Sequence, residues 1–591
     1  MNILLVAVNA KYIHSNLAVY SLKSYAKEYE SHINLAEYTI NHRVEYILQE
    51  VYQKKPDVLC LSCYIWNYRY MQELMIELHK LMPKLPIWVG GPEVSYEPEE
   101  FLKEYPMVTG VMIGEGEATF LELCQYYVNQ FGKSQVKIQS LSEAVEFANA
   151  KKQEKEALLQ ISGLAVRSYA GKVIRTSKRE ALSMDELPFC YDNMKEFKNR
   201  IIYYETSRGC PFSCSYCLSS IERGLRFRSM ELVKKELLFF LKHEIPQVKF
   251  VDRTFNCNHQ HAIEIWRFLK EHDNKITNFH FEISADLLTE EEIVLISSMR
   301  PGLIQLEIGV QSTNQPTIQE IHRTMNLSRL EQVVEKVQQA GNIHQHLDLI
   351  AGLPLEDFNS FQRSFDEIYR LKPEQLQLGF LKVLKGSYLY EHQKEYSLIY
   401  QEYPPYEVMA TQWLTYEEVL DIKLVEEMLE VYYNSGQFEM TMKVVELCFQ
   451  HPFELYWRLG KFYQEQGLLA ISHSRIRRSE ILLDFMSNCD EMRQELYKET
   501  LTFDLYYREN MKTRPKWAPQ SNTFKEITRE FCKNGKLSDI EPFYYDMEEI
   551  LVQKSLTQYP HRNQECGFYL FSYEEKNPLT GQAAVMLVKG K

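Results

Sequence analysis

The 591-residue sequence has no run that approaches the roughly 20 consecutive apolar residues of a bilayer-spanning helix, so it predicts no membrane segment. Its start, MNILLVAVNAKYIHSN, lacks the basic residues that open a secretory signal peptide. We expect its short apolar run to be a buried strand. Twelve cysteines in so long a chain are too sparse for a secreted disulfide framework, which favours a reducing cytoplasm.

Positive charge is also scarce. The chain has 67 Lys and Arg residues against 81 Asp and Glu, a formal net charge of −14. A large nucleic-acid-binding surface needs clustered Lys and Arg, so no nucleic-acid partner is expected. The short basic run at Arg475, Arg477 and Arg478 is interpreted as a solvated helix face.

The first segment alternates short apolar runs with stretches of helical periodicity. This alternation predicts βαβ units and a doubly wound, Rossmann-like α/β domain over residues 1–135. In such a domain, ligands bind at the carboxyl ends of the strands. The predicted strands are Asn2–Val8, Val58–Ser62, Ile87–Gly90 and Val108–Ile113, and the predicted helices are Leu17–Glu28, Tyr68–Leu81 and Glu117–Phe131.

Three further regions follow. Residues 136–198 are expected to be a linker with a β-hairpin around Ala170-Gly171. Residues 199–400 carry six strand candidates, each followed by helical sequence, which fits a partial (β/α)6 barrel like part of a TIM barrel. Residues 401–591 are predicted to be mostly α, with a short β-like tail. The six barrel strands are predicted at Ile201–Glu205, Val248–Asp252, His280–Ser284, Leu303–Gly309, Gln345–Ile350 and Gln375–Leu381.

The segment TSRGCPFSCSYC places Cys210, Cys214 and Cys217 in a CxxxCxxC pattern directly after a predicted strand. Three thiolates can hold three irons of one [4Fe–4S] cubane, which leaves the fourth iron without a protein ligand. That open iron can bind the amino and carboxylate groups of S-adenosylmethionine (SAM). A structural zinc site would need a fourth ligand, and the nearest candidates, Cys190 and Cys257, lie outside the loop.

This motif resembles that of the radical SAM superfamily, including the Arg-Gly before the first cysteine and Tyr216 before the third. The resemblance implies that Tyr216 lies beside the adenine of SAM. Three later segments, FVDRTFN, LEIGVQS and DLIAGLP, resemble barrel strands of the family that deliver residues toward SAM. The second-strand Gly-Gly-Glu pattern is absent, which leaves the partner of the SAM amino group open.

Polar residues at the carboxyl ends of these strands are the candidate site residues. For each carboxylate, the alternative is a structural pair with an arginine such as Arg253 or Arg323. The candidates for catalysis are Asp252, Glu282 and Glu307, and those for cofactor binding are Asn256, Gln311, Ser312 and Asp348.

A doubly wound domain before such a barrel resembles the cobalamin-binding subclass of the superfamily. The matching segments are the NAKYIHSNLA loop, the loop at Ser62, VGGPEVS and GEGE. The resemblance implies cobalamin-facing roles for His14, Ser62, Gly90, Gly91, Gly114 and Glu115. The Asp-x-His-x-x-Gly motif of free-standing cobalamin domains is absent, so His14 is interpreted as a polar or hydrogen-bonded loop residue rather than the cobalt ligand. A domain that has lost cobalamin is the alternative.

Methylthiotransferases are a rival, because their preceding domain binds a second cluster through three loop cysteines. Here Cys60, Cys63 and Cys124 fall on or beside a buried strand or within a helix, where small apolar core roles are expected.

The resemblance implies a cobalamin-dependent enzyme that cleaves SAM to a 5′-deoxyadenosyl radical and methylates an unactivated carbon. The implied cofactors are a [4Fe–4S] cluster, SAM and cobalamin, with an electron donor such as flavodoxin or ferredoxin. The substrate, whether a small molecule, a lipid or a protein side chain, stays open. The alternatives are a cyclase or rearrangement enzyme with the same cofactors, and a non-catalytic Fe–S/SAM-binding sensor or maturation protein.

Overall fold

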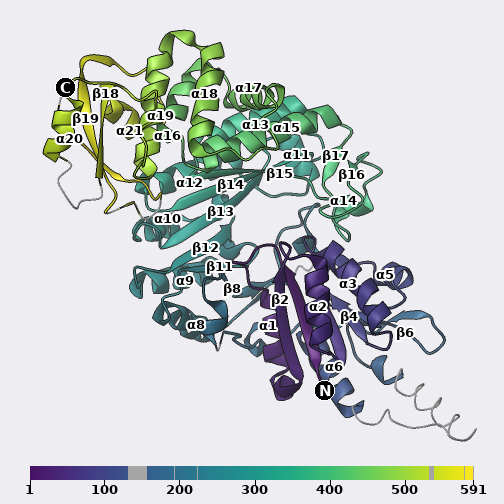
Figure 1. The fold of residues 1–591 in the computed structure, drawn as a ribbon. Coiled ribbons are helices and arrows are strands. Elements are labelled where there is room, and N and C mark those ends of the chain that lie inside the picture. The colour runs from purple at the N-terminus through teal and green to yellow at the C-terminus, as the bar shows by residue number, and fades with distance from the viewer. Residues whose placement is uncertain are drawn as a thin grey trace, which may run out of the picture. The chain divides into compact units, whose positions relative to one another are not determined.

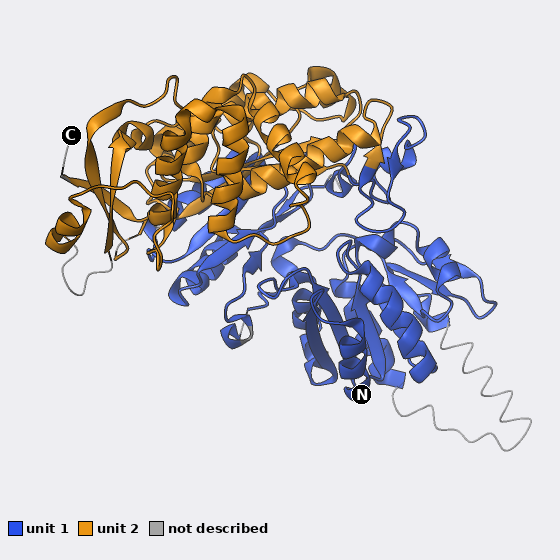
Figure 2. Ribbon diagram, turned by 45° about the horizontal axis from the view of Figure 1, so that its top comes forward, with its two compact units in different colours: residues 1–283, 382–408 blue, residues 284–381, 409–591 orange. Residues whose placement is uncertain are grey.

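The computed structural model describes residues 1–130, 156–191, 193–221, 224–531, 538–574, 576–577 and 580–589. It forms two compact units, coloured separately in Figure 2. The first combines Met1–Ile283 with Lys382–Val408, and the second combines Ser284–Leu381 with Met409–Lys591. Residues 136–155 of the expected linker lie outside the described residues, and the domain boundaries given above stay predictions.

The first unit opens with a seven-stranded sheet in the order β2-β1-β3-β4-β5-β6-β7 (Figure 1). β1 to β5 are parallel, and the order reverses at β1, as in a doubly wound sheet. All of β1 is buried, as its almost uninterrupted apolar sequence predicts for a central strand. The predicted fold class is confirmed. The strands are β1 Ile3–Asn9, β2 Ile33–Thr39, β3 Val58–Ser62, β4 Ile87–Gly90, β5 Gly110–Met112, β6 Leu164–Arg167 and β7 Val173–Arg175.

Two features of this sheet go beyond the sequence-based expectation. The sequence does not predict β2, because Asn34 and Glu37 interrupt its apolar pattern, which an edge strand tolerates. The hairpin around Ala170-Gly171 forms β6 and β7, and β6 pairs antiparallel with β5. The hairpin therefore extends the first sheet.

Helices cover both faces of this sheet. α1 contacts α6, whereas α2 contacts α3. The Asn16 side chain caps α1 by accepting a hydrogen bond from the Val19 amide, at 3.4 Å. The helices are α1 Leu17–Tyr25, α2 Val44–Gln53, α3 Tyr68–Leu81, α4 Pro92–Ser95, α5 Pro98–Glu104 and α6 Glu117–Gln130.

Six further strands form the second α/β region, and their order in the sheet follows the chain from β8 to β15. β8, β11 and β12 pair in parallel, as do β13, β14 and β15. A strand order that never reverses is that of a (β/α) barrel rather than a doubly wound sheet, so the predicted partial barrel is confirmed. The strands are β8 Ile202–Tyr204, β11 Gln247–Phe250 and β12 Asn278–Ile283 in the first unit, and β13 Ile304–Gln311, β14 His344–Ala351 and β15 Gln375–Phe380 in the second.

The barrel helices follow their strands. The buried residues of α12 and α13 recur at helical spacing, as the amphipathic pattern predicts for helices that cover a sheet. The helices are α8 Met230–Lys242 and α9 His259–Glu271 in the first unit, and α10 Glu290–Ser297, α11 Gln315–Glu320, α12 Leu327–Ala340 and α13 Phe358–Arg370 in the second.

The last region is mostly helical, as predicted, with one antiparallel three-stranded sheet. Helices α18 and α19 are separated at Asp490, whose φ of −152° and ψ of 82° are not helical. The sequence does not predict β18, which contains Pro542. The elements are α15 Tyr416–Leu429, α16 Glu439–Val445, α17 Pro452–Glu465, α18 Arg475–Cys489, α19 Gln494–Arg508, α20 Phe524–Phe531, β18 Ser538–Tyr545, α21 Met547–Val552, β19 Arg562–Ser572 and β20 Ala584–Lys589.

Candidate cofactor and active site

The three motif cysteines lie in one loop of the first unit. The loop leaves β9 (Ser207–Arg208) and ends at the short 3-10 helix Leu218–Ser220. β9 pairs antiparallel with β10 (Arg226–Phe227), and the close approach of the backbone at the base of the intervening loop requires Gly209. Gly209 has a φ of +97°, and a Cβ there would lie 2.4 Å from the Gly224 carbonyl oxygen. The backbone therefore holds the loop closed at the residue before Cys210.

The donor set of this loop fits a [4Fe–4S] cluster. None of the three cysteines forms a disulfide; Cys210 and Cys214 are buried and Cys217 is half-buried. The buried Ser215 hydroxyl has no hydrogen-bond partner among the described residues, and it could donate a hydrogen bond to a cluster sulfur. In the described part of the chain, no three Cys, His, Asp or Glu side chains surround a position for a single metal ion. A [4Fe–4S] cluster does not need three ligands around one metal ion, because each thiolate binds a different iron atom.

Tyr216 lies between two of these cysteines and is half-buried, and Asn256 is completely buried in a short 3-10 helix after β11. Thr254 brings that segment to the cluster loop, with 3.7 Å between its hydroxyl and the Cys210 sulfur. The SAM-binding roles of Tyr216 and Asn256 stay predictions.

Asp252 anchors the backbone just before the cluster loop. Its carboxylate accepts hydrogen bonds from the Thr206 amide at 3.0 Å, the Thr206 hydroxyl at 2.6 Å and the Ser207 hydroxyl at 2.5 Å. Complete burial raises its pKa, and these three hydrogen bonds oppose the rise. The partners are hydroxyls and an amide rather than an arginine. Such contacts give Asp252 a positioning role, and the catalytic role expected from the sequence stays a prediction.

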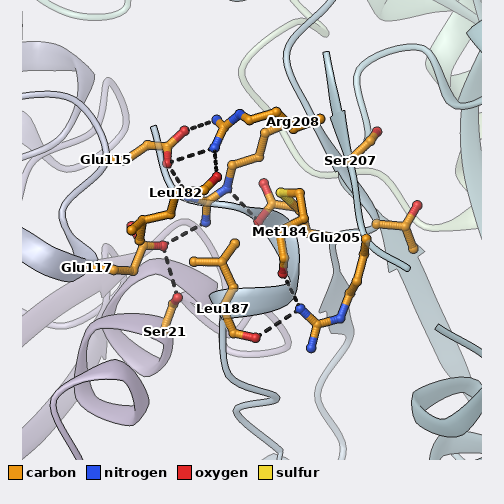
Figure 3. Close-up of polar contacts among 12 residues, drawn as sticks. Ser21, Glu115, Glu117, Leu182, Met184, Leu187, Glu205, Ser207 and Arg208 are labelled. Atoms are coloured by element: carbon orange, nitrogen blue, oxygen red, sulfur yellow. Dashed lines mark hydrogen bonds and ion pairs between the residues drawn. The ribbon is translucent and has the colours of Figure 1, made fainter. Parts of the chain in front are cut away.

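Arg208, which precedes the cluster loop, joins it to the GEGE segment of the first domain (Figure 3). Its guanidinium lies 3.1 Å from the Glu115 carboxylate and donates hydrogen bonds to Glu117 at 2.7 Å and Glu205 at 2.9 Å. Arg226 also pairs with Glu115. The carboxylate of Glu115, expected to face cobalamin, is thus held by two arginines. The sequence includes Arg208 in the motif but gives no sign of its pairing with Glu115 and Glu117, because these two lie far from Arg208 along the chain.

Glu117 continues this network into the first helix. Its carboxylate also accepts a hydrogen bond from Ser21 of α1, at 3.0 Å. Burial raises the pKa of Glu205 to about 7, although Arg208 opposes the shift. One guanidinium therefore balances three partly or fully buried carboxylates.

His14 lies in the loop after β1 and is bonded to the barrel. Its Nδ1 hydrogen-bonds the Tyr203 hydroxyl, and the two rings stack with centroids 5.9 Å apart. The Ile201 amide donates to the Ile13 carbonyl at 2.7 Å, and Ser15 donates to the Ile201 carbonyl at 3.1 Å. These bonds hold the loop along β8, so His14 is a hydrogen-bonded loop residue here. The cobalamin-facing role that the resemblance implies for His14 stays a prediction.

Ser62, Gly90, Gly91 and Gly114 lie at or just beyond the carboxyl ends of β3, β4 and β5. The backbone conformation alone requires a glycine at position 91, because its φ is +111° and a Cβ would lie 2.4 Å from the Cys63 carbonyl oxygen. At Gly90 the nearest atom would be 3.5 Å away, and at Gly114 nothing lies within 4 Å. Open backbone at these two positions is compatible with the predicted approach of a cofactor.

The other cysteines of the first domain do not form a cluster loop. Cys60, Cys63 and Cys124 are all buried. Burial raises the pKa of each thiol, that of Cys60 to about 12. Protonated thiols in an apolar core act as small hydrophobic residues.

Residues 382–408 form a segment of the first unit that the sequence does not predict as part of a site. It contains α14 Tyr388–Glu391, β16 Ile399–Tyr400 and β17 Val408–Ala410, the last of which crosses the unit boundary. The Leu389 amide donates to the Ser215 carbonyl in the cluster loop at 3.0 Å. Tyr406 donates to Glu93 at 2.8 Å, beside the Gly-Gly turn. The segment therefore bonds to both predicted cofactor regions.

In the second unit, Glu307 and Asp348 lie on one face of the sheet. Glu307 is in register with His346, whose Nε2 is 3.0 Å from the Asp348 carboxylate. Gln311 has a φ of +73° at a β-bulge that ends β13. Ser312 is fully buried and donates to Glu356 at 2.6 Å, and burial raises the pKa of Glu356 to about 7. The predicted cofactor and catalytic roles of these residues stay predictions.

Comparisons with known families match three parts of the chain. Residues 3–124 match the B12 binding domain, and residues 204–368 match the radical SAM superfamily. Residues 394–560 match a family described as a protein of unknown function, DUF4080.

Curated relatives match about half of this chain. The chain is 25% identical over 319 residues to the cobalamin-dependent radical SAM methyltransferase TokK of Streptomyces tokunonensis, covering 52% of this chain and 44% of that protein. It is 27% identical over 314 residues to the uncharacterized methyltransferase PH0819 of Pyrococcus horikoshii, covering 51% of this chain and 62% of that one. The chain thus spans about half of the length of these curated relatives.

A solved structure has the same fold over most of the chain. The cobalamin-dependent S-adenosylmethionine radical enzyme OxsB, with aqua-cobalamin bound, superposes with a TM-score of 0.55 at 18% identity. The match covers 85% of this chain and 80% of that one.

The fold and the cysteine loop define a radical SAM protein with a preceding α/β domain. The chain carries a B12-binding domain followed by a radical SAM domain, the combination of the cobalamin-binding radical SAM proteins. No helix in the described ranges is both long and apolar enough to cross a membrane.

Proposed function

We propose that the protein is a cobalamin-dependent radical SAM methyltransferase that acts on an unactivated carbon. The observation that carries the proposal is the ion-pair network around Arg208, which joins the cluster loop to the GEGE segment of the B12-binding domain within one compact unit. Relatives named as methyltransferases support the reaction class. We propose a small molecule as the substrate.

When bound, the cluster and SAM supply a 5′-deoxyadenosyl radical, and cobalamin supplies a methyl group. Cys210, Cys214 and Cys217 would hold the cluster, and Asp252 keeps their loop in place through Thr206 and Ser207. The turns after β3, β4 and β5 would hold cobalamin at the carboxyl edge of the first sheet. Arg208 keeps the two loops at a fixed separation, because its planar guanidinium pairs with carboxylates on both sides.

The proposed reaction needs an electron from a donor such as flavodoxin or ferredoxin and a reducing cytoplasm. None of the eleven described cysteines forms a disulfide, which supports this setting.

The test is to reconstitute the full chain anaerobically with iron, sulfide and hydroxocobalamin, desalt it, and measure bound cobalamin and cluster. SAM and reductant are then added and 5′-deoxyadenosine is measured. The Cys210→Ala variant should keep cobalamin and lose both the cluster and 5′-deoxyadenosine formation. The matched control is Cys257→Ala, a half-buried cysteine outside the loop, which should keep all three.

Two outcomes would contradict the proposal. A normal cluster without retained cobalamin would leave a radical SAM enzyme that uses no cobalamin. Bound SAM that stays intact under strong reductant would instead favour a cluster-bearing sensor.

A further inference from the structure

A cavity of about 440 Å³ lies within residues 382–408 of the first unit. Pockets that bind small organic molecules are usually roughly 300–1,000 Å³, so this one can hold such a molecule. All of the residues that line it belong to this segment, and none of them is among the predicted cofactor residues. Three are tyrosines, Tyr390, Tyr400 and Tyr406, and the charged ones are Lys385 and Glu402.

The hydroxyl protons of the three cavity tyrosines are already engaged. Tyr390 donates to Glu97 at 2.9 Å, and Tyr406 donates to Glu93 at 2.8 Å. Tyr400 donates to a glutamine side chain of the segment, also at 2.9 Å. A hydrogen bond to a carboxylate polarises a phenol and leaves its ring richer in electrons. The rings are therefore the part of these tyrosines that remains for a ligand.

The charges around the cavity sum to a negative value. Glu93, Glu97 and Glu402 supply three carboxylates, and Lys385 is the one cation among the lining residues. The Lys385 ammonium lies 3.6 Å from the Glu97 carboxylate, so these two charges offset each other. Burial raises the pKa of Glu93. Even with Glu93 protonated, the negative charge of Glu402 remains, because this exposed side chain forms no ion pair with the described residues.

The three rings hold no cation of the protein itself. On the same hairpin, the Arg69 guanidinium lies over the ring of Tyr403, 5.1 Å from its centroid. No lysine or arginine of the described residues lies over the ring of Tyr390, Tyr400 or Tyr406. The cavity thus combines electron-rich rings and uncancelled negative charge without a cation to use them.

The walls of the cavity are joined to both predicted cofactor regions. Tyr390 follows Leu389, whose amide donates to the Ser215 carbonyl of the cysteine loop at 3.0 Å. Tyr406 is bonded to Glu93, which lies in α4 directly after the Gly-Gly turn. A molecule in the cavity would therefore contact the segment that covers the cysteine loop.

We infer that this cavity binds an organic cation through its alkylammonium group. Aromatic rings attract such a cation through their negative faces, and a nearby carboxylate adds Coulombic attraction. Tyr390, Tyr400 and Tyr406 supply the rings, and Glu402 supplies the charge. The inference goes beyond the proposed function, because no part of it depends on SAM cleavage.

The test measures binding to the full reconstituted chain by isothermal titration calorimetry. The probes are choline chloride and the uncharged isostere of choline, the alcohol in which a tert-butyl group replaces trimethylammonium. Sodium chloride keeps the ionic strength equal. Tyr400→Leu removes one ring, whereas Tyr400→Phe removes only the hydroxyl. The matched control is Tyr403→Leu, because Tyr403 is exposed on the same hairpin and does not line the cavity.

We expect choline to bind at least about tenfold more tightly than the uncharged isostere, because only the cation is attracted to the rings. Tyr400→Leu should weaken choline binding by about tenfold, and Tyr400→Phe by less than about threefold. Glu402→Gln should weaken it by about threefold, since its carboxylate is exposed to solvent. Tyr403→Leu should bind choline as the unchanged protein does.

Three results would overturn the inference. The first is the absence of choline binding, and the second is equal affinity for choline and its uncharged isostere. The third is unchanged choline affinity in both Tyr400→Leu and Glu402→Gln, which would place the cation outside the cavity. Circular dichroism checks that each variant is folded. If Tyr400→Leu is not, the exposed position of Glu402 makes Glu402→Gln the deciding variant.

Discussion

Arg208 and Glu115 form an ion pair with 3.1 Å between Nη1 and Oε2, which links the residue before the cysteine loop to the turn after β5. Both side chains are less than one-fifth exposed, so solvent screens the pair only weakly. Glu117 and Glu205 share the same guanidinium. Four predictions concern this network and the residues around it.

Arg208→Lys should weaken the first unit. A lysine keeps the charge but cannot pair with three carboxylates through one planar fork, so some buried oxygens lose their partners. We expect the free energy of unfolding to fall by about 2 kcal/mol and the cobalamin retained after desalting to drop. Urea unfolding monitored by circular dichroism measures the free energy of unfolding. Arg175→Lys, which alters the more exposed pair with Glu99, should cost under about 0.5 kcal/mol. Equal losses in the two variants would contradict a special role for Arg208.

Glu205 should make stability depend on pH. Burial raises its pKa from 4.5 to about 7, so between these values the folded chain holds a proton that the unfolded chain has released. The free energy of unfolding therefore falls as pH rises from 4.5 to about 7, by up to about 3 kcal/mol. Glu205→Gln should remove this part of the decline, as measured by urea unfolding at several pH values.

The matched control for this dependence is Glu99→Gln. Hydrogen bonds from Arg175 lower the pKa of Glu99, so its effect on stability appears only as pH falls below its ordinary range. The slope between pH 5 and 7 should therefore be the same as in the unchanged protein. A slope that survives in Glu205→Gln would show that other carboxyl groups cause it.

His14→Ala should retain cobalamin. The Nδ1 atom of His14 is hydrogen-bonded to Tyr203, and its loop is bonded along β8. We expect near-stoichiometric cobalamin in the variant, and in the unchanged protein a cobalt(II) electron paramagnetic resonance spectrum without nitrogen hyperfine coupling from a histidine. Tyr203→Phe, which removes only the hydroxyl, serves as the control for the loop. Loss of cobalamin in His14→Ala but not in Tyr203→Phe would make His14 a cobalt ligand.

The neighbouring glycines Gly90 and Gly91 should respond differently to alanine. A Cβ at Gly91 would meet the Cys63 carbonyl oxygen at 2.4 Å on a backbone with φ of +111°. Gly91→Ala should thus destabilise the first domain by more than about 3 kcal/mol. Gly90→Ala makes only ordinary contacts, the nearest at 3.5 Å, and should fold normally. The cobalamin affinity of the folded Gly90→Ala variant is then measured by titration. A loss of affinity would indicate that cobalamin contacts the backbone at Gly90.

The sequence predicts those elements whose pattern is strong and local. β3, β4 and α3 have the predicted bounds, because continuous apolar runs and a regular helical period define them. The cysteine loop is found from its spacing alone. β2 is missed because Asn34 and Glu37 interrupt its apolar pattern, and Glu37 lies nearly buried in an ion pair with Arg200 that no local pattern shows.

Other parts of the candidate site depend on contacts between distant residues. Arg208 reaches Glu115 and Glu117 from far along the chain, and no local pattern marks which carboxylates it will meet. From the sequence, Gly91 is expected to face cobalamin. In the structure, the positive φ of Gly91 and the nearby Cys63 carbonyl oxygen already require a glycine at this position. The contact between Leu389 and Ser215 has no sequence pattern at all.

That last contact has a consequence for how the protein is made. The Ser215 carbonyl in the cysteine loop receives its partner only when Leu389 has been synthesised, about 170 residues after Cys217, which takes roughly 10–30 s on a ribosome. During that interval the nascent chain already carries all three cysteines, while residues 382–408 do not yet cover their loop. Iron–sulfur assembly factors would thus find the loop most accessible during translation, and slow codons between these positions would lengthen the period available for loading.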